Sequence, residues 1–426
     1  MPELSDLMAY LQASPSPYHA VHNTAQRLTD AGFEELAMQD DWREVDFRRC
    51  FVRRGGALVA WADPGSPPHG RFRVIGAHTD SPNLRVKPLP DSGCAGWKQL
   101  GVEVYGGALW NSWLDRDLGL SGRVVVSIEG ELSERLLLVD RALARVPQLA
   151  IHLDRDVNKQ GLKLNPQTHL TPVWGVGEPE ADEFNAFVAA ELDVSPRQVR
   201  GWDLMFHDMT PPATIGRNDE LLASSRLDNL LSCWAGLHAL LSSGQTSYRV
   251  PSTAVLCLFD HEEVGSTSAT GADGALLAQV LERLATARGS SRDDLLRALS
   301  ASMCASVDMA HATHPNHSER HDPDHFVTVG HGPVIKINSN QRYATDAGSH
   351  SELVECCVAA EVPHQVFNSR NDIACGSTIG PVTAAGLGMA TADIGIAQLS
   401  MHSARELCGT EDPLHLVSVL EHFVRR

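Results

Sequence analysis

The sequence contains no run of about 18 apolar residues, the shortest length typical of a membrane-spanning helix. Its first twenty residues carry acidic side chains early and lack the continuous apolar core of a secretory signal peptide. The nine cysteines are scattered through apolar contexts without a Cys-x-x-Cys pair, a pattern that indicates buried, reduced thiols rather than a zinc ribbon. We therefore expect a cytoplasmic protein that does not enter a membrane.

Basic residues are also fewer than acidic ones. The chain has 35 Lys and Arg against 53 Asp and Glu, and its formal net charge is −18. Nucleic acids and anionic membranes bind basic surfaces, so we expect neither as a partner. Phosphate-binding P-loops, G-x-G-x-x-G turns and G-x-S-x-G nucleophile elbows are missing as well. The sequence thus offers no support for nucleotide binding or for a serine nucleophile.

The sequence does contain an alternation of helical and strand patterns. Its 426 residues exceed the roughly 250–300 at which single cores stop growing, so we expect two domains. Apolar residues recur at helical spacing from Leu4 to Leu36, with a break at "SPSP". Buried strands are predicted for "ALVAWADP", "RFRVIGAHTD", "STAVLCLFD", "MCASVDMA" and "TADIGIAQLSMH". The alternation predicts an α/β fold, a doubly wound mixed sheet covered by helices.

Two further helices are predicted with specific end signals. In residues 224–244, Ser224 or Ser225 is the expected N-cap and Gly244 the expected terminator. In the last helix of the chain, Asp412 is expected to cap the first turn that contains Pro413.

The stretch from about Leu89 to Arg217 departs from this alternation. Its short, alternating β patterns with a single helical pattern predict an inserted, mostly β domain. We therefore divide the chain into a discontinuous domain of residues 1–88 and 218–426 and an inserted domain of residues 89–217.

Polar side chains follow the buried strands at their carboxyl ends, where open α/β sheets bind ligands. These residues are His78, Glu262, Glu263, Asp308 and His402. A lone "HTD" after a strand is commonly a turn or a helix cap, and "DHEE" is commonly a solvated loop. The densest histidine cluster, His311–His325, has the polar, proline-containing composition of a loop. The joint occurrence of acids and histidines at one sheet edge is what indicates a function.

The residue types in this group are those of a hydrolytic metal site. A hydrolytic di-metal centre needs about five imidazole and carboxylate ligands, one of them a bridging carboxylate. His78 and Asp308 are candidates for one ion, Glu263 and His402 for the other, and Asp228 at the start of its helix for the bridge. Asp228 taken singly is equally an ordinary first-turn helix residue.

Two adjacent glutamates suit two different tasks. A carboxylate bound to a dication loses basicity, whereas a free carboxylate beside an activated water can take its proton. One of Glu262 and Glu263 therefore binds and the other is the base, and the residues alone do not decide which. Asp80, two residues after His78, is placed to hold the second nitrogen of a metal-ligating imidazole.

Seven motifs in chain order resemble the aspartyl aminopeptidase family, and they span nearly the whole chain. They are "SPSPYHAV", "GAHTDSPNLRVKP", "SRLDNL", "FDHEEVGS", "DMAHATHPNH", "GPVIKINSNQRYAT" and "QLSMHSARE". The resemblance implies a zinc exopeptidase-like fold with an inserted dimerisation domain. It also implies two Zn²⁺ per subunit, with Co²⁺ or Mn²⁺ as substitutes that N/O ligands accept.

The resemblance assigns roles residue by residue. It makes Asp228 the bridge, Glu262 the general base and Asp80 the residue that orients His78. The metal ligands it implies are His78, Asp228, Glu263, Asp308 and His402. It further implies a homo-oligomer, a tetrahedral dodecamer built from dimers, in which His169 in "NPQTHLTPV" reaches a neighbouring subunit's active site.

An acidic substrate side chain requires a cation in its pocket. The matching family segment offers Lys336, with Tyr343 as a second candidate. We therefore expect an aminopeptidase that removes Asp or Glu from peptides. The alternatives are a di-metal aminopeptidase with neutral or basic preference, a di-metal deacylase or carboxypeptidase, and a non-catalytic scaffold shell.

Overall fold

The computed structural model describes residues 2–243 and 252–426. Its contacts divide the chain into two compact units. The first unit comprises residues 1–80, 212–401 and 406–426, and the second comprises residues 81–211 and 402–405. These divisions fall earlier in the chain than the expected 88/89 and 217/218, and the dimerisation role of the inserted part stays a prediction. Within the described residues, no helix has the length and apolar character needed to cross a membrane.

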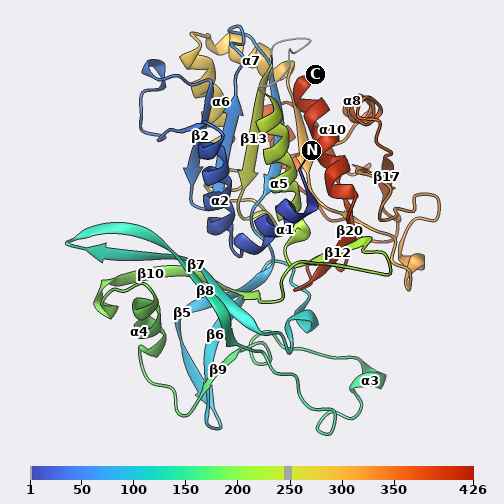
Figure 1. Ribbon diagram of the computed structural model, residues 1–426. Helices are drawn as coiled ribbons and strands as arrows, with labels where there is room; N and C mark the ends of the chain where they lie inside the picture. Colours follow the sequence, from blue (N-terminus) through green and yellow to red (C-terminus); the bar gives the residue numbers. More distant parts are fainter. Residues whose placement is uncertain (1, 244–251) are drawn as a thin grey trace. The chain divides into compact units, whose positions relative to one another are not determined.

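A mixed sheet forms the centre of the first unit (Figure 1), as the sequence predicts. Among the described residues it has nine strands, in the spatial order β1 (Glu34–Glu35), β2 (Arg49–Arg54), β3 (Ala57–Ala62), β13 (Thr253–Phe259), β4 (Phe72–His78), β14 (Met303–Val307), β18 (Ala390–Gly395), β16 (Val334–Ile337) and β17 (Gln365–Asn368). Its four central strands, from β13 to β18, run parallel. Their carboxyl ends therefore meet at one edge.

Strand β13 shows why these sequences are continuously apolar. All seven of its residues are buried. Ala254, Leu256 and Leu258 belong to one hydrophobic core, and the residues between them belong to a second core on the opposite face. Because successive side chains of a strand point to opposite faces, a strand covered on both sides needs apolar residues at every position.

Helices supply the two cores. The first core contains residues of α1 (Leu4–Ala13), α2 (Pro17–Asp30), α5 (Leu227–Ser242), α8 (Ala347–Ala359) and α10 (Asp412–Arg425). The second contains residues of α6 (Leu276–Ala287), α7 (Arg292–Ser300) and α9 (Ile379–Leu387). The sheet is therefore covered on both faces, which confirms the predicted doubly wound arrangement (Figure 1).

A smaller sheet lies in the same unit, and it explains why one predicted helix cap is wrong. Its order is β11 (Ala213–Ile215), β12 (Leu221–Ser224), β20 (Glu406–Gly409), β19 (Ala397–Leu399) and β15 (Ala310–His311). Ser224 is paired with Glu406 in this sheet, so it is not available as a cap. Helix α5 instead follows Arg226, whose φ is 59°, with no side-chain cap. The expected terminator, Gly244, lies outside the described residues.

The predicted cap of the last helix is also wrong. Glu411 is the N-cap of α10, and Asp412 is the first helical residue. The Asp412 carboxylate accepts hydrogen bonds from the N–H groups of Gly330 (2.7 Å) and Gly332 (2.9 Å). It therefore anchors a distant loop, which the local sequence does not reveal.

The second unit is mostly β, as predicted. Its sheet has the order β8 (Glu131–Ala144), β7 (Leu118–Ile128), β10 (Val199–Asp208), β5 (Asn83–Cys94), β6 (Trp97–Tyr105) and β9 (Val173–Val176). Two helices accompany it, α3 (Val157–Gln160) and α4 (Glu183–Glu191). Phe184 and Val188 of α4 are buried in its core.

Candidate metal centre

The strand register aligns the predicted site residues of the first unit at the carboxyl ends of neighbouring strands. Phe259 at the end of β13 is the partner of His78 at the end of β4. On the other side of β4, Ser306 of β14 pairs with Gly76, and continuing this register places Asp308 beside His78. Residues directly after these strands therefore gather around the His78 imidazole.

Asp80 holds the turn after β13 in place. His261 adopts a left-handed backbone conformation (φ 63°), and the chain then enters a 3₁₀ turn over Glu262–Val264. The Asp80 carboxylate accepts the N–H of Glu262 on one oxygen and the N–H of Glu263 on the other, each at 3.1 Å. One buried carboxylate thus fixes the backbone of both glutamates.

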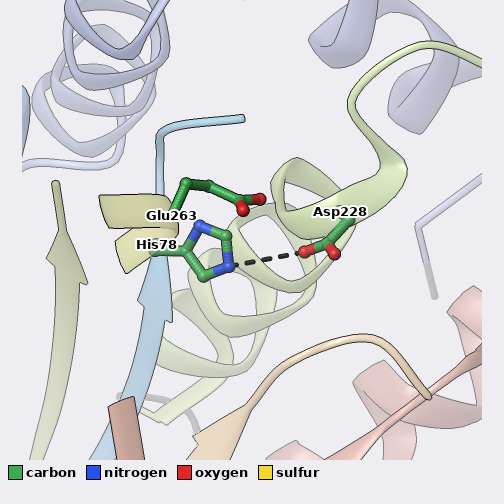
Figure 2. Close-up of side chains that lie close together, drawn as sticks. All are labelled: His78, Asp228 and Glu263. Atoms are coloured by element: carbon green, nitrogen blue, oxygen red, sulfur yellow. Dashed lines mark ion pairs between the residues drawn. The ribbon is translucent and has the colours of Figure 1, made fainter. Parts of the chain in front are cut away.

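The His78 ring is oriented as a metal-ligating imidazole requires. Its Nδ1 lies 3.0 Å from the backbone oxygen and 3.3 Å from the carboxylate Oδ1 of Asp80. Its Nε2 faces Asp228 Oδ1 at 3.4 Å and Asp308 Oδ1 at 3.7 Å. Figure 2 shows the ring edge turned toward Asp228, with Glu263 beside it. A carboxylate on one ring nitrogen fixes the tautomer that leaves the other available to a cation.

Asp228 is held by residues that the sequence reasoning missed. Its backbone is non-helical (φ −81°, ψ 105°), and its N–H donates to Glu406 Oε2 at 3.0 Å. The next residue, Asn229, donates from Nδ2 to the Val307 carbonyl oxygen at 2.8 Å. These contacts tie the start of α5 to β20 through Glu406 and to β14, the strand that precedes Asp308, through Val307. The only available signal was that Glu406 and Asn229 lie inside the quoted family motifs.

The donor set fits a zinc ion. One ligand atom each from His78, Asp228 and Glu263 lie within 4.8 Å of one another. His78 and Asp228 are buried and Glu263 is half-buried. Imidazole nitrogen and carboxylate oxygen are the ligands of catalytic zinc sites. Asp308 extends this set, with its Oδ1 3.7 Å from the same His78 Nε2 that faces Asp228.

The electrostatics of the cluster show how strongly it favours positive charge. Burial lowers the pKa of His78, but the carboxylates of Asp228, Asp308 and Asp80 outweigh it and leave that pKa well above its usual value. Burial, with neighbouring carboxylates adding, raises the pKa of Glu262 to about 8 and that of Glu263 well above its ordinary range. Cations that bind here displace protons from these groups.

Lys336 is buried beside the cluster, although a lysine in a strand is commonly exposed. Only 1% of its surface is accessible. Its Nζ donates to the Met309 carbonyl oxygen at 3.1 Å and lies 3.7 Å from Asp308 Oδ2. The Tyr343 ring centroid is 5.0 Å from the same nitrogen. Burial raises the pKa of Asp308, but Lys336, His78 and Asp228 together outweigh it and lower the pKa of that carboxyl.

Two predicted site residues belong to the second unit. His402 has Nδ1 3.1 Å from the Gly107 carbonyl oxygen and a left-handed backbone (φ 67°). His169 is exposed, and its Nδ1 accepts a hydrogen bond from the Asn165 N–H at 3.0 Å. Their roles as metal ligand and substrate-binding residue stay predictions.

Comparison with known proteins identifies the family. Residues 10–424 match the family described as Aminopeptidase I zinc metalloprotease (M18). The chain belongs to this family, as the resemblance to aspartyl aminopeptidases predicted, and it is a zinc-dependent aminopeptidase.

Individual relatives cover almost the whole chain. The "Probable M18 family aminopeptidase 2" of Streptomyces avermitilis is 54% identical over 421 residues, which cover 98% of this chain and 96% of the relative. Ape4 in the cryo-EM structure of its complex with Nbr1 has a TM-score of 0.95 at 36% identity and covers 99% of this chain and 85% of its own. The S. cerevisiae mApe1 dodecamer has a TM-score of 0.86 at 27% identity, with 99% and 95% covered.

The Asp80 contacts generate a prediction. Asp80→Asn leaves one of the two glutamate N–H groups without its carboxylate acceptor and weakens the hold on His78. We expect zinc affinity to fall about 10–100-fold, the usual consequence of changing a residue that orients a ligand. Zinc affinity is measured by competition with a chromogenic chelator on metal-free protein.

Asp412→Asn is the matched control, because Asp412 also accepts two backbone N–H groups but anchors a loop. Both variants should lose thermal stability, and only Asp80→Asn should lose zinc affinity. Equal zinc affinity in the two variants would contradict the orienting role of Asp80.

Proposed function

We propose that this zinc aminopeptidase uses two metal ions and a glutamate base to remove acidic residues from the N-terminus of peptides. The observation that carries the proposal is the shared anchoring of Glu262 and Glu263 on Asp80, opposite the imidazole of His78. Two adjacent glutamates whose backbone is held beside one ligand cluster suit one metal ligand and one base. The family membership supports the same reaction class.

In the proposed arrangement His78 and Asp308 hold one ion, Glu263 and His402 hold the other, and Asp228 bridges them. The tight grouping of His78, Asp228 and Glu263 supports a metal site at these residues. Zinc, when bound, supplies Lewis acidity and lowers the pKa of a water molecule to about 7.

Glu262 is the proposed base. It takes the proton of the attacking water and delivers a proton to the leaving nitrogen of the peptide. Its burial and crowded acidic surroundings favour the protonated carboxyl, because they raise its pKa. A dication bound beside this carboxyl would oppose that rise and favour the carboxylate form that a base requires.

Lys336 and Tyr343 are the proposed source of the acidic preference. Tyr343 lines a cavity of about 220 Å³, together with His311, Arg320, Phe367, Arg370 and Cys375. Lys336 Nζ lies 5.0 Å from the centroid of the Tyr343 ring and 3.7 Å from Asp308 Oδ2. Cationic side chains around this cavity, Arg320 and Arg370, favour a carboxylate over an apolar substrate side chain.

We further propose a homo-oligomer, specifically a tetrahedral dodecamer built from dimers of the inserted unit, with His169 serving a neighbouring active site. The dodecameric assembly of the related mApe1 supports this proposal. All nine cysteines are free thiols, seven of them buried, which supports the expected cytoplasmic location.

A panel of chromogenic substrates tests the proposed specificity. The purified full chain is assayed on Asp-, Glu-, Leu- and Lys-nitroanilides and on N-acetyl-Asp-nitroanilide, before and after chelation and with zinc or cobalt restored. We expect release from Asp and Glu substrates alone, with loss on chelation and recovery with metal. The free amine is required, so the acetylated substrate should be inert.

The other outcomes separate the alternatives. Release from Leu or Lys substrates would keep the metal mechanism and discard the acidic pocket. Release of nitroaniline from the acetylated substrate would show that no free α-amine is required, which would favour the deacylase or carboxypeptidase alternative. Failure on every substrate with every metal would favour a non-catalytic shell.

A pair of isosteric substitutions tests the division of labour between the glutamates. Glu262→Gln should retain zinc and lose kcat by about 10²–10⁴-fold, because a proton-transfer group is missing. Glu263→Gln should lose zinc first, because a charged ligand is missing. Zinc content by atomic absorption and kcat are measured on the same preparations, and identical behaviour of the two variants would refute the assignment.

A further inference from the structure

Three buried charged side chains connect the metal centre to the interior of the sheet. They are Asp308, Lys336 and Asp393, with 7%, 1% and 0% of their surfaces accessible. Lys336 Nζ lies 3.7 Å from Asp308 Oδ2. Lys336 and Asp393 are direct partners in the antiparallel pair of β16 with β18. The ammonium therefore lies within ion-pair distance of Asp308, the candidate metal ligand, and the second carboxylate, Asp393, is its partner on the neighbouring strand.

Asp393 is firmly held on its side of Lys336. Its Oδ1 accepts a hydrogen bond from Thr378 Oγ1 at 2.5 Å, and its Oδ2 accepts one from the Ala344 N–H at 2.6 Å. Its own N–H donates to Thr345 Oγ1 at 2.8 Å. A Cβ on Gly380 would come within 2.6 Å of both carboxylate oxygens, so the first turn of α9 closes over them. The carboxylate has no room to swing away.

The two charges act on one another. Burial raises the pKa of Asp393, and the Lys336 ammonium opposes that rise. A buried ammonium needs a compensating anion, since an unpaired buried charge is strongly unfavourable. If Asp308 alone compensated Lys336, the pair would be neutral and Asp308 would attract a dication only weakly. With Asp393 included, the three groups sum to one negative charge.

We propose that Asp393 is a positioning residue that shares the charge of Lys336 and thereby keeps Asp308 available to a metal ion. The inference rests on the proposed function, in which Asp308 is a ligand. Asp393 acts through Lys336 and does not contact the metal. A purely structural carboxylate would affect stability and leave zinc affinity intact.

The test is a set of zinc affinities on the full-length, metal-free protein, with thermal melts to establish folding. Asp393→Asn preserves the shape of the side chain and removes its charge, and it should weaken zinc binding about 10–100-fold. Thr378→Val is the matched control, because it removes a hydrogen bond to Asp393 and leaves the charge. Its zinc affinity should stay within about threefold of wild type, far less than a changed outer-shell residue produces.

Removing the cation should reverse the effect. Lys336→Met should bind zinc more tightly than wild type, because Asp308 is no longer compensated. Asp393→Asn combined with Lys336→Met should have the zinc affinity of Lys336→Met alone, because Asp393 acts only through the lysine. If Asp393→Asn does not fold, Lys336→Met and the double variant still carry the test, since a Lys336→Met affinity equal to wild type overturns the inference.

Two further results would overturn it. One is an unchanged zinc affinity in Asp393→Asn. The other is an equal loss from Asp393→Asn with and without Lys336, which would mean that Asp393 acts independently of the lysine. Asp308→Asn distinguishes this failure from that of the proposed function: if Asp308→Asn itself leaves zinc affinity unchanged, the ligand assignment is wrong and the inference fails with it.

Discussion

The carboxylate of Asp80 is the contact on which the candidate metal centre of this protein depends. It joins the end of β4 to the turn after β13 by accepting the N–H groups of Glu262 and Glu263, and the same residue fixes Nδ1 of His78. Hydrogen bonds to a charged acceptor contribute about 1.5–3 kcal/mol each. The backbones of both glutamates and the imidazole of His78 are therefore held by the same residue, which fixes their positions relative to one another.

The same arrangement concentrates acids in a place where water does not screen them. Buried carboxylates close together hold protons tightly unless a cation is present, and the raised pKa of Glu262 and Glu263 reflects this. Dications relieve the repulsion, while Lys336 relieves part of it from inside the sheet. The apolar strands that lead into the cluster are rigid supports, packed on both faces, so the acids cannot spread apart.

Much of this fold could be predicted from the sequence, because a strand buried on both faces has a distinctive apolar pattern and a polar residue at its end. Contacts between segments that are distant in the chain could not be predicted in this way. Both helix-cap predictions failed because Ser224 pairs with Glu406 and Asp412 binds the backbone of Gly330 and Gly332. The hold of Glu406 on Asp228 was missed for the same reason. The grouping of His78, Glu263 and Asp308 could be predicted because these residues follow adjacent parallel strands.

Zinc-edge anomalous diffraction from crystals of the full chain grown with zinc tests the central claim most directly. The account predicts two anomalous peaks on either side of the Asp228 carboxylate, about 3.5–4 Å apart as in other two-metal sites. One should lie between His78 and Asp308 and the other next to Glu263, with Glu262 binding neither ion. A single peak, a peak away from His78, or a peak ligated by Glu262 would contradict it.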